Sequence, residues 1–296
     1  MDVSIIIVNY NTRDLLLDCI QSVKEKTTGL SCEVIIVDNA SSDGSVENVK
    51  RRHPDVKILG CNENSGFGKG NNLGMQMAVG KYYLLLNPDT LLMNNAIKIM
   101  FDFMERTENR NIAVCGAAIY NARQKPALSF GRFPTLCSMI FYSLPLSALF
   151  RGNEGLVLNT TGKPFPVDYV TGADFFIRRE VLEKAGFFDE KYFAYYEESD
   201  LTKRIANQGY RSVIVPAANI MHLEGKSFKN PLKREQLMYA SSLYYLSKFQ
   251  KNGMLFKLYC LLNQAKYSLY KFLYPEVNAS RWNEMISISK LYRTKK

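Results

Sequence analysis

The chain has 296 residues, 47% of them hydrophobic, which is enough for one large domain or two small ones with a full core. The sequence shows no clean run of about 18 uncharged apolar residues, the pattern that would indicate a membrane span. The strand-length apolar run at the N-terminus lacks a preceding basic region, so we expect no signal peptide. The net charge is +10, and the six scattered cysteines have no Cys-x-x-Cys spacing, which argues against a zinc ribbon or disulfide framework and favours reduced thiols in a cytosol.

Four short apolar runs in the first ninety residues each lead into acidic or amide residues. They are Val3–Val8, Val34–Val37, Val56–Leu59 and Tyr82–Leu86. Continuous Val/Ile/Leu runs bounded by turn residues are typical of strands buried on both faces, which indicates a parallel sheet. In such sheets the ligand lies beyond the carboxyl ends of the strands. We therefore expect the polar residues to line one crevice.

Helical patterns separate these runs. Thr12 is a candidate N-cap, and apolar residues follow it at helical spacing from Leu15 to Val23. Further helices are predicted over Ser45–Arg52, Gly70–Val79 and Asn94–Arg106. The alternation of strands and helices predicts an α/β domain.

The second half of the chain is less regular, with an irregular apolar insert at about 121–165. We expect a first domain over residues 1–226 and a basic helical extension over 227–296, where the pattern is helical from Pro231 onward. The other predicted elements are strands at 112–119 and Ser212–Val215, strand and turn over Val167–Arg178, and a helix over Leu201–Asn207.

Asp38 and Asn39 directly follow the second predicted strand. A carboxylate at this place can accept a hydrogen bond from a nucleotide base or a ribose hydroxyl. The alternative is a polar loop whose side chains, Asp43 among them, cap the next helix. The residues themselves leave both interpretations open.

A glycine-rich turn, Asn64–Gly74, follows the third predicted strand. Glycines let the backbone approach a ligand closely, and a helix N-terminus favours phosphate. The spacing is not the dinucleotide fingerprint, because Asn71 stands where the third glycine would fall. A simple tight turn is the alternative.

Asp89 lies in Asn87-Pro88-Asp89, directly after the fourth predicted strand. An aspartate on a rigid strand end beside a phosphate crevice is a natural ligand for Mg²⁺ or Mn²⁺. The alternative is an N-cap or turn aspartate at the start of the following helix.

Three acids, Glu197, Glu198 and Asp200, follow a run of aromatic residues. Clustered carboxylates with apolar walls raise one another's pKa, which suits a general base. The alternative is a helix start, where the dipole would favour the charged form and lower the pKa. Geometry has to decide between the two effects.

Together these residues resemble a family 2 inverting glycosyltransferase with the GT-A fold, and more narrowly its bacterial rhamnosyltransferase-like branch. The fold implied is a Rossmann-like, mixed and mainly parallel sheet flanked by helices. The strings that carry the resemblance are Val3-Ser-Ile-Ile-Ile-Val-Asn-Tyr-Asn11, Val37-Asp-Asn-Ala-Ser-Ser-Asp43, Asn64-Ser-Gly-Phe-Gly68 with Gly70-Asn-Asn72, Leu86-Asn-Pro-Asp89, Gly172-Ala173 and Tyr196-Glu-Glu-Ser-Asp-Leu201.

The resemblance implies roles for single residues. Glu198 aligns with the family's catalytic base, with Asp200 as the reserve candidate, and Asp89 takes the metal role, where Asn87 replaces the first aspartate of many relatives. His222, which by itself would more often be structural, lies where the family can supply a further ligand to Mg²⁺ or Mn²⁺. The residues implied to bind the nucleotide sugar are Asn9, Tyr10, Asn11, Asp38, Asn39, Gly66, Phe67, Asn71, Asn72, Asn87 and Gly172.

The implied reaction moves a sugar from a nucleoside diphosphate sugar to a glycan or lipid-linked acceptor in cell-surface polysaccharide synthesis, with inversion at C1. The narrow resemblance favours dTDP-rhamnose as donor, and a UDP-sugar is also compatible. A sugar-1-phosphate nucleotidyltransferase is a rival interpretation, although only Arg13 supplies a positive charge in the first loop.

The positive charge is confined to the C-terminal extension. Residues 227–296 hold 13 basic and 3 acidic side chains, whereas the first 226 residues hold 25 of each. The segment from Met254 to Leu273 mixes Leu, Phe and Tyr with Lys, a pattern typical of helices that lie on anionic membranes. We therefore expect peripheral attachment to the cytoplasmic face of the inner membrane. Packing on the body or on a second subunit is the alternative, and the neutral body disfavours a nucleic-acid binder.

Overall fold

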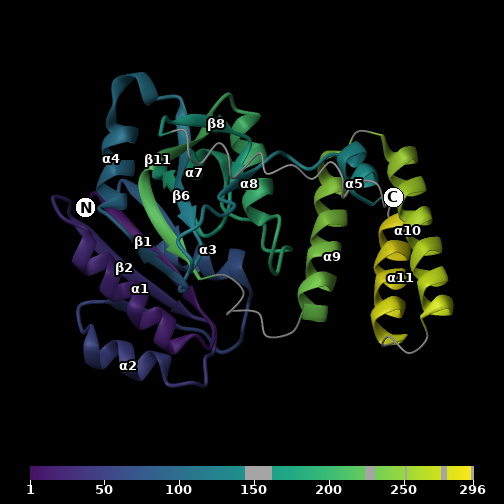
Figure 1. Ribbon diagram of the computed structural model, residues 1–296, viewed down its shortest axis with the longest axis horizontal. Coiled ribbons are helices and arrows are strands. Elements are labelled where there is room, and N and C mark those ends of the chain that lie inside the picture. The colour runs from purple at the N-terminus through teal and green to yellow at the C-terminus, as the bar shows by residue number, and fades with distance from the viewer. Residues whose placement is uncertain (144–161, 224–230, 251, 275–278, 295–296) are drawn as a thin grey trace. The chain divides into compact units, whose positions relative to one another are not determined.

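The computed structural model describes residues 1–143, 162–223, 231–250, 252–274 and 279–294 (Figure 1). The chain divides into two compact units. Of the described residues, the sheet unit holds 1–133, 162–193 and 197–223, and the helical unit holds 134–143, 194–196 and those from 231 onward. Part of the insert predicted at 121–165 lies outside the described residues.

The sheet unit is built on one large mixed sheet with the strand order β3-β2-β1-β4-β10-β6-β11-β5, and β8 pairs with β11. A small second sheet joins β7 (Phe130–Gly131) to β9 (Tyr169–Val170). The strands of the large sheet are β1 (Val3–Asn9), β2 (Cys32–Asp38), β3 (Lys57–Gly60), β4 (Tyr82–Leu86), β5 (Thr90–Leu92), β6 (Ile112–Tyr120), β8 (Phe165–Val167), β10 (Asp174–Arg178) and β11 (Arg211–His222).

The four N-terminal apolar runs form four neighbouring parallel strands, as predicted. Strand β1 pairs in parallel with both β2 and β4, and β2 pairs in parallel with β3. β10 then runs antiparallel between β4 and β6, whereas β6 and β11 are parallel. The carboxyl ends of β1, β2, β3, β4, β6 and β11 therefore share one edge of the sheet, at which the antiparallel β10 begins.

Helices cover both faces of the sheet. One apolar cluster packs α1 and α4 against β1 through side chains such as Leu16, Ile20 and Met100. The other packs α3, α7 and α8 on the opposite face, through Met75 and Leu201 among others. The helices of the unit are α1 (Arg13–Lys26), α2 (Ser45–Arg52), α3 (Phe67–Met77), α4 (Ala96–Glu105), the 3₁₀ turn η1 (Thr107–Asn109), α7 (Arg179–Ala185) and α8 (Glu197–Ala206).

Several boundaries differ from the prediction. Helix α3 begins at Phe67 rather than Gly70, because its glycines are accommodated within the first turns. Strand β11 runs to His222, beyond the predicted end at Val215, because a register shift between Val215 and Asn219 absorbs Pro216. Thr12 precedes α1, but its hydroxyl donates to the Asn9 side chain instead of capping the helix.

The helical unit contains α5 (Leu136–Ser143), α9 (Pro231–Phe249), α10 (Gly253–Leu273) and α11 (Ala279–Thr294). Leu243, Phe256 and Cys260 form one of its buried clusters, and Tyr267, Trp282 and Met285 form another. None of the described helices combines the length and apolar content that a membrane span requires. All six cysteines are free thiols.

Candidate active site

Most of the predicted site residues come together at the carboxyl edge of the large sheet. Register pairs Asn9 with Asp38 at the ends of β1 and β2. His222, at the end of β11, pairs with Thr90, the residue that follows Asp89. The loops that carry the predicted nucleotide, metal and sugar contacts thus all start from or return to this edge, as the topology of a parallel sheet requires.

Asn9 and Asp38 are fully buried and bind each other directly. The Asn9 side-chain nitrogen donates to Oδ1 of Asp38 over 2.7 Å and to the Ser41 hydroxyl over 3.0 Å, and the Ser41 backbone N–H donates to Oδ2 of Asp38 over 2.8 Å. The carboxylate thus fixes the loop after β2 and keeps further acceptor capacity on both oxygens. The sequence analysis missed Ser41, although it lies inside the motif that contains Asp38.

The loop after β1 is held in an unusual conformation. Asn11 has φ +54°, and its side-chain oxygen accepts the Ser42 N–H over 2.8 Å. Such a left-handed residue is tolerated by Asn more readily than by most side chains. The neighbouring Tyr10 is 44% exposed. A rigid loop with an exposed ring at the sheet edge can flank a flat base. Asp43 also acts within this region, because its carboxylate accepts the N–H groups of Arg13 and Ser45, so the predicted capping role is present beside the Asp38 site.

The glycine-rich turn packs closely against the chain that precedes α8. Gly66 has φ +88°, and a Cβ at this position would lie 2.1 Å from the Phe193 carbonyl oxygen, to which the Phe67 N–H donates over 2.9 Å. The Asn39 side chain donates to the Gly66 carbonyl over 3.1 Å. Gly172, in the turn between β9 and β10, also lies close, because a Cβ at this position would lie 3.1 Å from the Phe67 ring. Three predicted ligand-binding segments therefore meet here.

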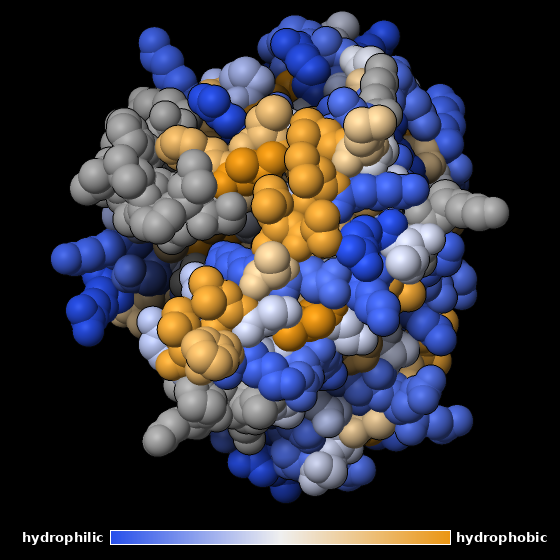
Figure 2. All heavy atoms as spheres, turned by 90° about the vertical axis from the view of Figure 1, so that its right-hand side faces the viewer, coloured by the Kyte–Doolittle hydropathy of each residue, from blue (hydrophilic) through white to orange (hydrophobic). Residues whose placement is uncertain are grey.

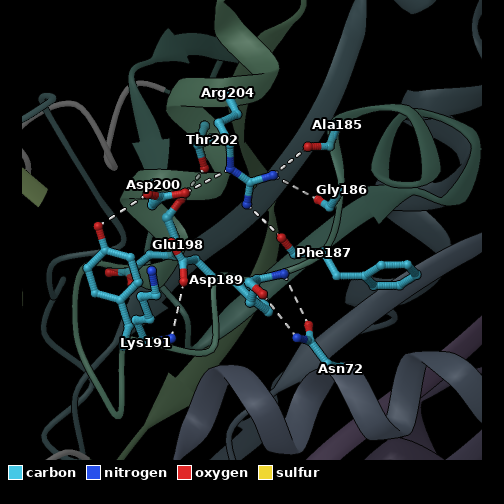
Figure 3. Close-up of polar contacts among 12 residues, drawn as sticks. Asn72, Ala185, Gly186, Phe187, Asp189, Lys191, Glu198, Asp200, Thr202 and Arg204 are labelled. Atoms are coloured by element: carbon cyan, nitrogen blue, oxygen red, sulfur yellow. Dashed lines mark hydrogen bonds and ion pairs between the residues drawn. The ribbon is translucent and has the colours of Figure 1, made fainter. Parts of the chain in front are cut away.

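Two asparagines of α3 satisfy backbone groups. Asn71 donates to the Phe67 carbonyl over 3.0 Å. Asn72 bridges to the loop before α8, because it donates to the Phe188 carbonyl over 3.0 Å and accepts the Phe188 N–H over 3.1 Å (Figure 3). It also donates to the Glu190 carboxylate over 3.1 Å. The amide of Asn72 thus holds α3 against the loop before α8, and the expected contact of Asn72 with the nucleotide sugar stays a prediction.

Asp89 and His222 form the candidate metal centre. Oδ1 of Asp89 lies 3.1 Å from Nε2 of His222, and Asp89 is 3% exposed. A carboxylate and an imidazole suit Mn²⁺, and Mg²⁺ is commonly held by one or two protein groups plus substrate phosphates. Among the described residues no group of three or more His, Cys, Asp and Glu side chains could hold a metal. Asn87 borders the pair, and its carbonyl accepts the Thr90 hydroxyl over 2.7 Å.

Glu197 and Glu198 begin α8, and one side-chain oxygen of each is buried without a hydrogen-bond partner in the described part of the chain. The Glu197 stem lies against α3, within 3.7 Å of the position a Cβ on Gly68 would take. Burial raises the pKa of Glu198 to about 7. Burial, and then the charge of Glu198, raises the pKa of Glu197 well above its ordinary value. Desolvation thus outweighs the backbone hydrogen bonds that lower these two pKa values, which favours the raised-pKa interpretation of the cluster.

Asp200 is bound inside the protein. Its carboxylate accepts from Nε of Arg204 over 2.8 Å and from the Tyr192 hydroxyl over 3.2 Å, and its side chain is completely buried. Arg204 in turn donates to the carbonyls of residues 185–187 (Figure 3). This pairing holds the loop before α8 in place and makes Asp200 a positioning residue, so Glu198 is the stronger candidate for a base.

A further carboxylate, not singled out from the sequence, lies at the same edge. Asp174 begins β10, is completely buried and accepts the Ala117 N–H through Oδ2, while Oδ1 has no partner. Burial raises its pKa well above the ordinary value. The signal in the sequence was an acid within the apolar run Asp174–Arg178, directly after Gly172-Ala173.

Known proteins share sequence and fold with this chain. Residues 4–186 match the model of the family described as Glycosyl transferase family 2. The N-acetylglucosaminyl-diphospho-decaprenol L-rhamnosyltransferase of Mycobacterium tuberculosis is 28% identical over 212 residues, which cover 66% of this chain and 67% of that protein. The low-salt glycan biosynthesis hexosyltransferase Agl10 of Haloferax volcanii is 28% identical over 207 residues, 69% of this chain and 61% of the relative.

Solved structures share the fold. GalNAc-T7 with UDP, GalNAc and Mn²⁺ superposes with a TM-score of 0.63 at 15% identity, over 100% of this chain and 55% of that one. The mannosyltransferase PcManGT from Pyrobaculum calidifontis, in complex with GDP-Man and Mn²⁺, superposes with a TM-score of 0.57 at 17% identity, over 98% of this chain and 73% of that one. The mixed sheet flanked by helices is thus the predicted GT-A fold, and the family match decides against the nucleotidyltransferase interpretation. The chain belongs to glycosyl transferase family 2 and is a glycosyltransferase.

Proposed function

We propose that the protein transfers a sugar from a nucleoside diphosphate sugar to a hydroxyl group of a glycan or lipid-linked acceptor, with inversion at the anomeric carbon. The observation that carries this proposal is the sheet edge shared by Asp38 and the Asp89–His222 pair, together with the start of α8, where Glu197 packs against α3 and the next residue, Glu198, has a raised pKa. A nucleotide, a diphosphate and an acceptor hydroxyl need these three kinds of group.

The nucleotide end of the donor is assigned to the loops after β1 and β2. Asp38 accepts from the base or ribose through its remaining lone pairs. Tyr10, exposed beside it, flanks the base. The buried Asn9–Asp38 hydrogen bond keeps the carboxylate in place, so the loop is organised before the donor binds.

The diphosphate is assigned to the Asp89–His222 pair. Mg²⁺ or Mn²⁺ held there would supply positive charge to offset the charge that grows on the leaving diphosphate. Asp89 is rigidly placed, because its own carbonyl accepts the Leu223 N–H over 2.9 Å and so joins the turn after β4 to the end of β11. A fixed position costs less reorganisation during the reaction.

Glu198 is assigned as the general base. A carboxyl with a pKa near 7 removes a proton from the acceptor hydroxyl more effectively than an ordinary glutamate does. The hydroxyl oxygen then forms a bond to C1 while the bond from C1 to the diphosphate oxygen breaks on the opposite face. The proton remains on Glu198, and the configuration at C1 inverts without a covalent enzyme intermediate.

Rhamnose from dTDP-rhamnose is the proposed donor sugar. Its support is the names of relatives, since the mycobacterial protein and the rhamnosyltransferase WbbL of Escherichia coli, 24% identical over 196 residues, are both named for rhamnose transfer. The mycobacterial name also supports a lipid-linked acceptor. Cell-surface polysaccharide synthesis is the process proposed on the same grounds.

A donor panel tests the proposal. Purified protein would be incubated with dTDP-rhamnose, UDP-glucose, UDP-N-acetylglucosamine and GDP-mannose in the presence of Mn²⁺, and thermal shift and release of the free nucleotide would be measured. We expect one donor to stabilise the protein and to be slowly hydrolysed more than the others, and we expect this donor to be dTDP-rhamnose. The absence of both signals with every nucleotide sugar would contradict the proposal, and a preference for a different sugar would contradict the rhamnose assignment alone.

A further inference from the structure

Helix α10 of the helical unit has two apolar faces. One face is buried and carries Phe256, Tyr259, Cys260, Asn263 and Tyr267. These residues recur at intervals of three and four, as expected for a helix that packs on its neighbours. This face needs no partner beyond the unit itself.

The second face is exposed. Met254 is 84% exposed, Leu262 56% and Phe272 80%, and they are among seven large apolar side chains of α10 that face solvent. At 100° per residue these side chains fall within an arc about 120° wide, opposite the buried face. Figure 2 views this side of the helical unit and shows hydrophobic side chains gathered among charged ones. We define the α10 stripe as Met254, Leu258, Leu261, Leu262, Leu269, Phe272 and Leu273.

Basic side chains flank the α10 stripe. By the same helical geometry Lys257 lies on one side of it and Lys266 on the other, and α10 contains no acidic residue. The Lys266 ammonium lies 5.6 Å from the centroid of the Tyr267 ring and 5.7 Å from that of Tyr270. The four described helices of the unit together carry nine Lys and Arg against two Glu.

We infer that the α10 stripe lies on an anionic membrane surface, parallel to the bilayer plane. A continuous apolar face flanked by lysines, on a helix without acids, is the pattern of an interfacial helix. Three lysines within 21 residues suit a helix that lies on the surface. A second copy of this chain fits less well, because it would bring two strongly positive surfaces together, whereas lipid phosphates complement them.

Vesicle flotation tests this inference without any sugar substrate, so its outcome is separate from that of the proposed reaction. The full chain would be mixed with vesicles of phosphatidylglycerol and phosphatidylethanolamine, and in parallel with phosphatidylcholine vesicles. We expect flotation with the anionic vesicles and about tenfold or greater loss of binding on neutral ones, with binding that also weakens as salt rises.

The decisive variant replaces Leu258, Leu262, Leu269 and Phe272 by Gln. We expect it to lose more than about a hundredfold in vesicle affinity while far-UV circular dichroism and donor hydrolysis are unchanged. The matched control replaces exposed apolar residues of the sheet unit, Met77, Val79, Met93 and Leu128, by Gln, and it should float like the parent. A milder pair, Lys257→Gln with Lys266→Gln, should lower affinity about tenfold and covers the case in which the fourfold variant misfolds.

Three results would overturn the inference. The first is that the parent protein does not bind anionic vesicles. The second is that a folded stripe variant floats as well as the parent. The third is that the parent does not bind vesicles but forms a dimer in light scattering, and that the stripe substitutions dissociate this dimer. The last result would assign the stripe to a second copy of the chain.

Discussion

Oδ1 of Asp89 lies 3.1 Å from Nε2 of His222, although 133 positions separate the two residues in the chain. The pairing of β5 with β11 brings them together, because Thr90 and His222 are partners in its register. Both side chains are largely shielded from solvent, with His222 16% exposed. The pairing thus places an acid and an imidazole together at the sheet edge, and the proposed cation site rests on this contact.

Asp89→Asn should weaken metal-dependent binding of the nucleotide. The substitution keeps the shape of the side chain but removes the negative charge, and a neutral amide is a poorer ligand for a hard cation. We expect the Mn²⁺ concentration needed for half-maximal donor hydrolysis to rise about tenfold or more. His222→Gln should act in the same direction with a smaller effect.

The control for this titration is Asp102→Asn, at an exposed aspartate that pairs with Lys98. Its metal dependence should match that of the parent. If Asp89→Asn and the parent titrate alike with Mn²⁺, Asp89 has no metal role and the diphosphate has to be placed elsewhere.

The pH profile of the reaction should report Glu198. A general base acts in its deprotonated form, and burial raises the pKa of Glu198 to about 7. The value of kcat/KM should therefore rise with pH through about 7 and level off above it. Glu198→Gln should bind the donor normally but lose about 100- to 10,000-fold in kcat, as measured by calorimetry and product formation.

Glu198→Asp separates the chemistry from the fold. The aspartate keeps a carboxylate base on a side chain one methylene shorter, so we expect partial activity and a kcat/KM that still rises with pH. The control Glu108→Gln, at an exposed site, should leave kcat and the pH profile unchanged. Full activity in Glu198→Gln would exclude this residue as the base.

Glu197→Gln should change stability in a pH-dependent way. The pKa of Glu197 in the folded protein is raised above its ordinary value of 4.5, so the folded state holds this proton more tightly than the unfolded chain does. Stability from this group is fully present below pH 4.5 and is lost as pH rises through the folded-state pKa. The midpoint of thermal unfolding of the variant, relative to the parent, should therefore be higher at pH 8 than at pH 5. An equal difference at both pH values would show that Glu197 is not held protonated.

The sheet could be predicted from the sequence because its strands are short, continuous apolar runs. Val3–Val8 and Tyr82–Leu86 need no knowledge of their neighbours to be recognised as buried strands. The full length of β11 was not predictable in this way, because Pro216 interrupts its pattern and only the bulge opposite β6 makes the proline tolerable.

The site was predictable where residues sit at strand ends and less so where long-range contacts set their role. Asp38 follows an apolar run, so its place at the edge could be deduced. The roles of Asn72 and Asp200 depend on partners in the loop before α8, which no local pattern reveals. The roles of the buried Asp174 and of Ser41 likewise depend on long-range contacts, with Ala117 and Asn9 respectively.

Gly66→Ala should destabilise the protein. A methyl group there would lie 2.1 Å from the Phe193 carbonyl oxygen, and the backbone has φ +88°, so the substitution combines a clash with conformational strain. We expect a loss of about 2 kcal/mol or more in the free energy of unfolding, measured by urea titration. Gly60→Ala is the matched control, since a Cβ there meets nothing within 4 Å. Equal stability of the two variants would mean that the turn can relax away from Phe193.

Arg204→Met should lower the free energy of unfolding more than the double variant that changes both Asp200 and Arg204. The single variant removes the guanidinium from the buried carboxylate of Asp200 and releases the carbonyls of residues 185–187, which we expect to lower stability by about 3 kcal/mol or more. In the double variant Asp200→Asn with Arg204→Met the buried charge is gone, so part of the loss should be recovered, and a double-mutant cycle in urea measures the coupling. Because the loop that this pair holds leads into Glu198, both variants should also lower kcat more than they raise KM for the donor. Strict additivity of the two substitutions would show that Asp200 and Arg204 do not depend on each other, and the loop before α8 would then need a different support.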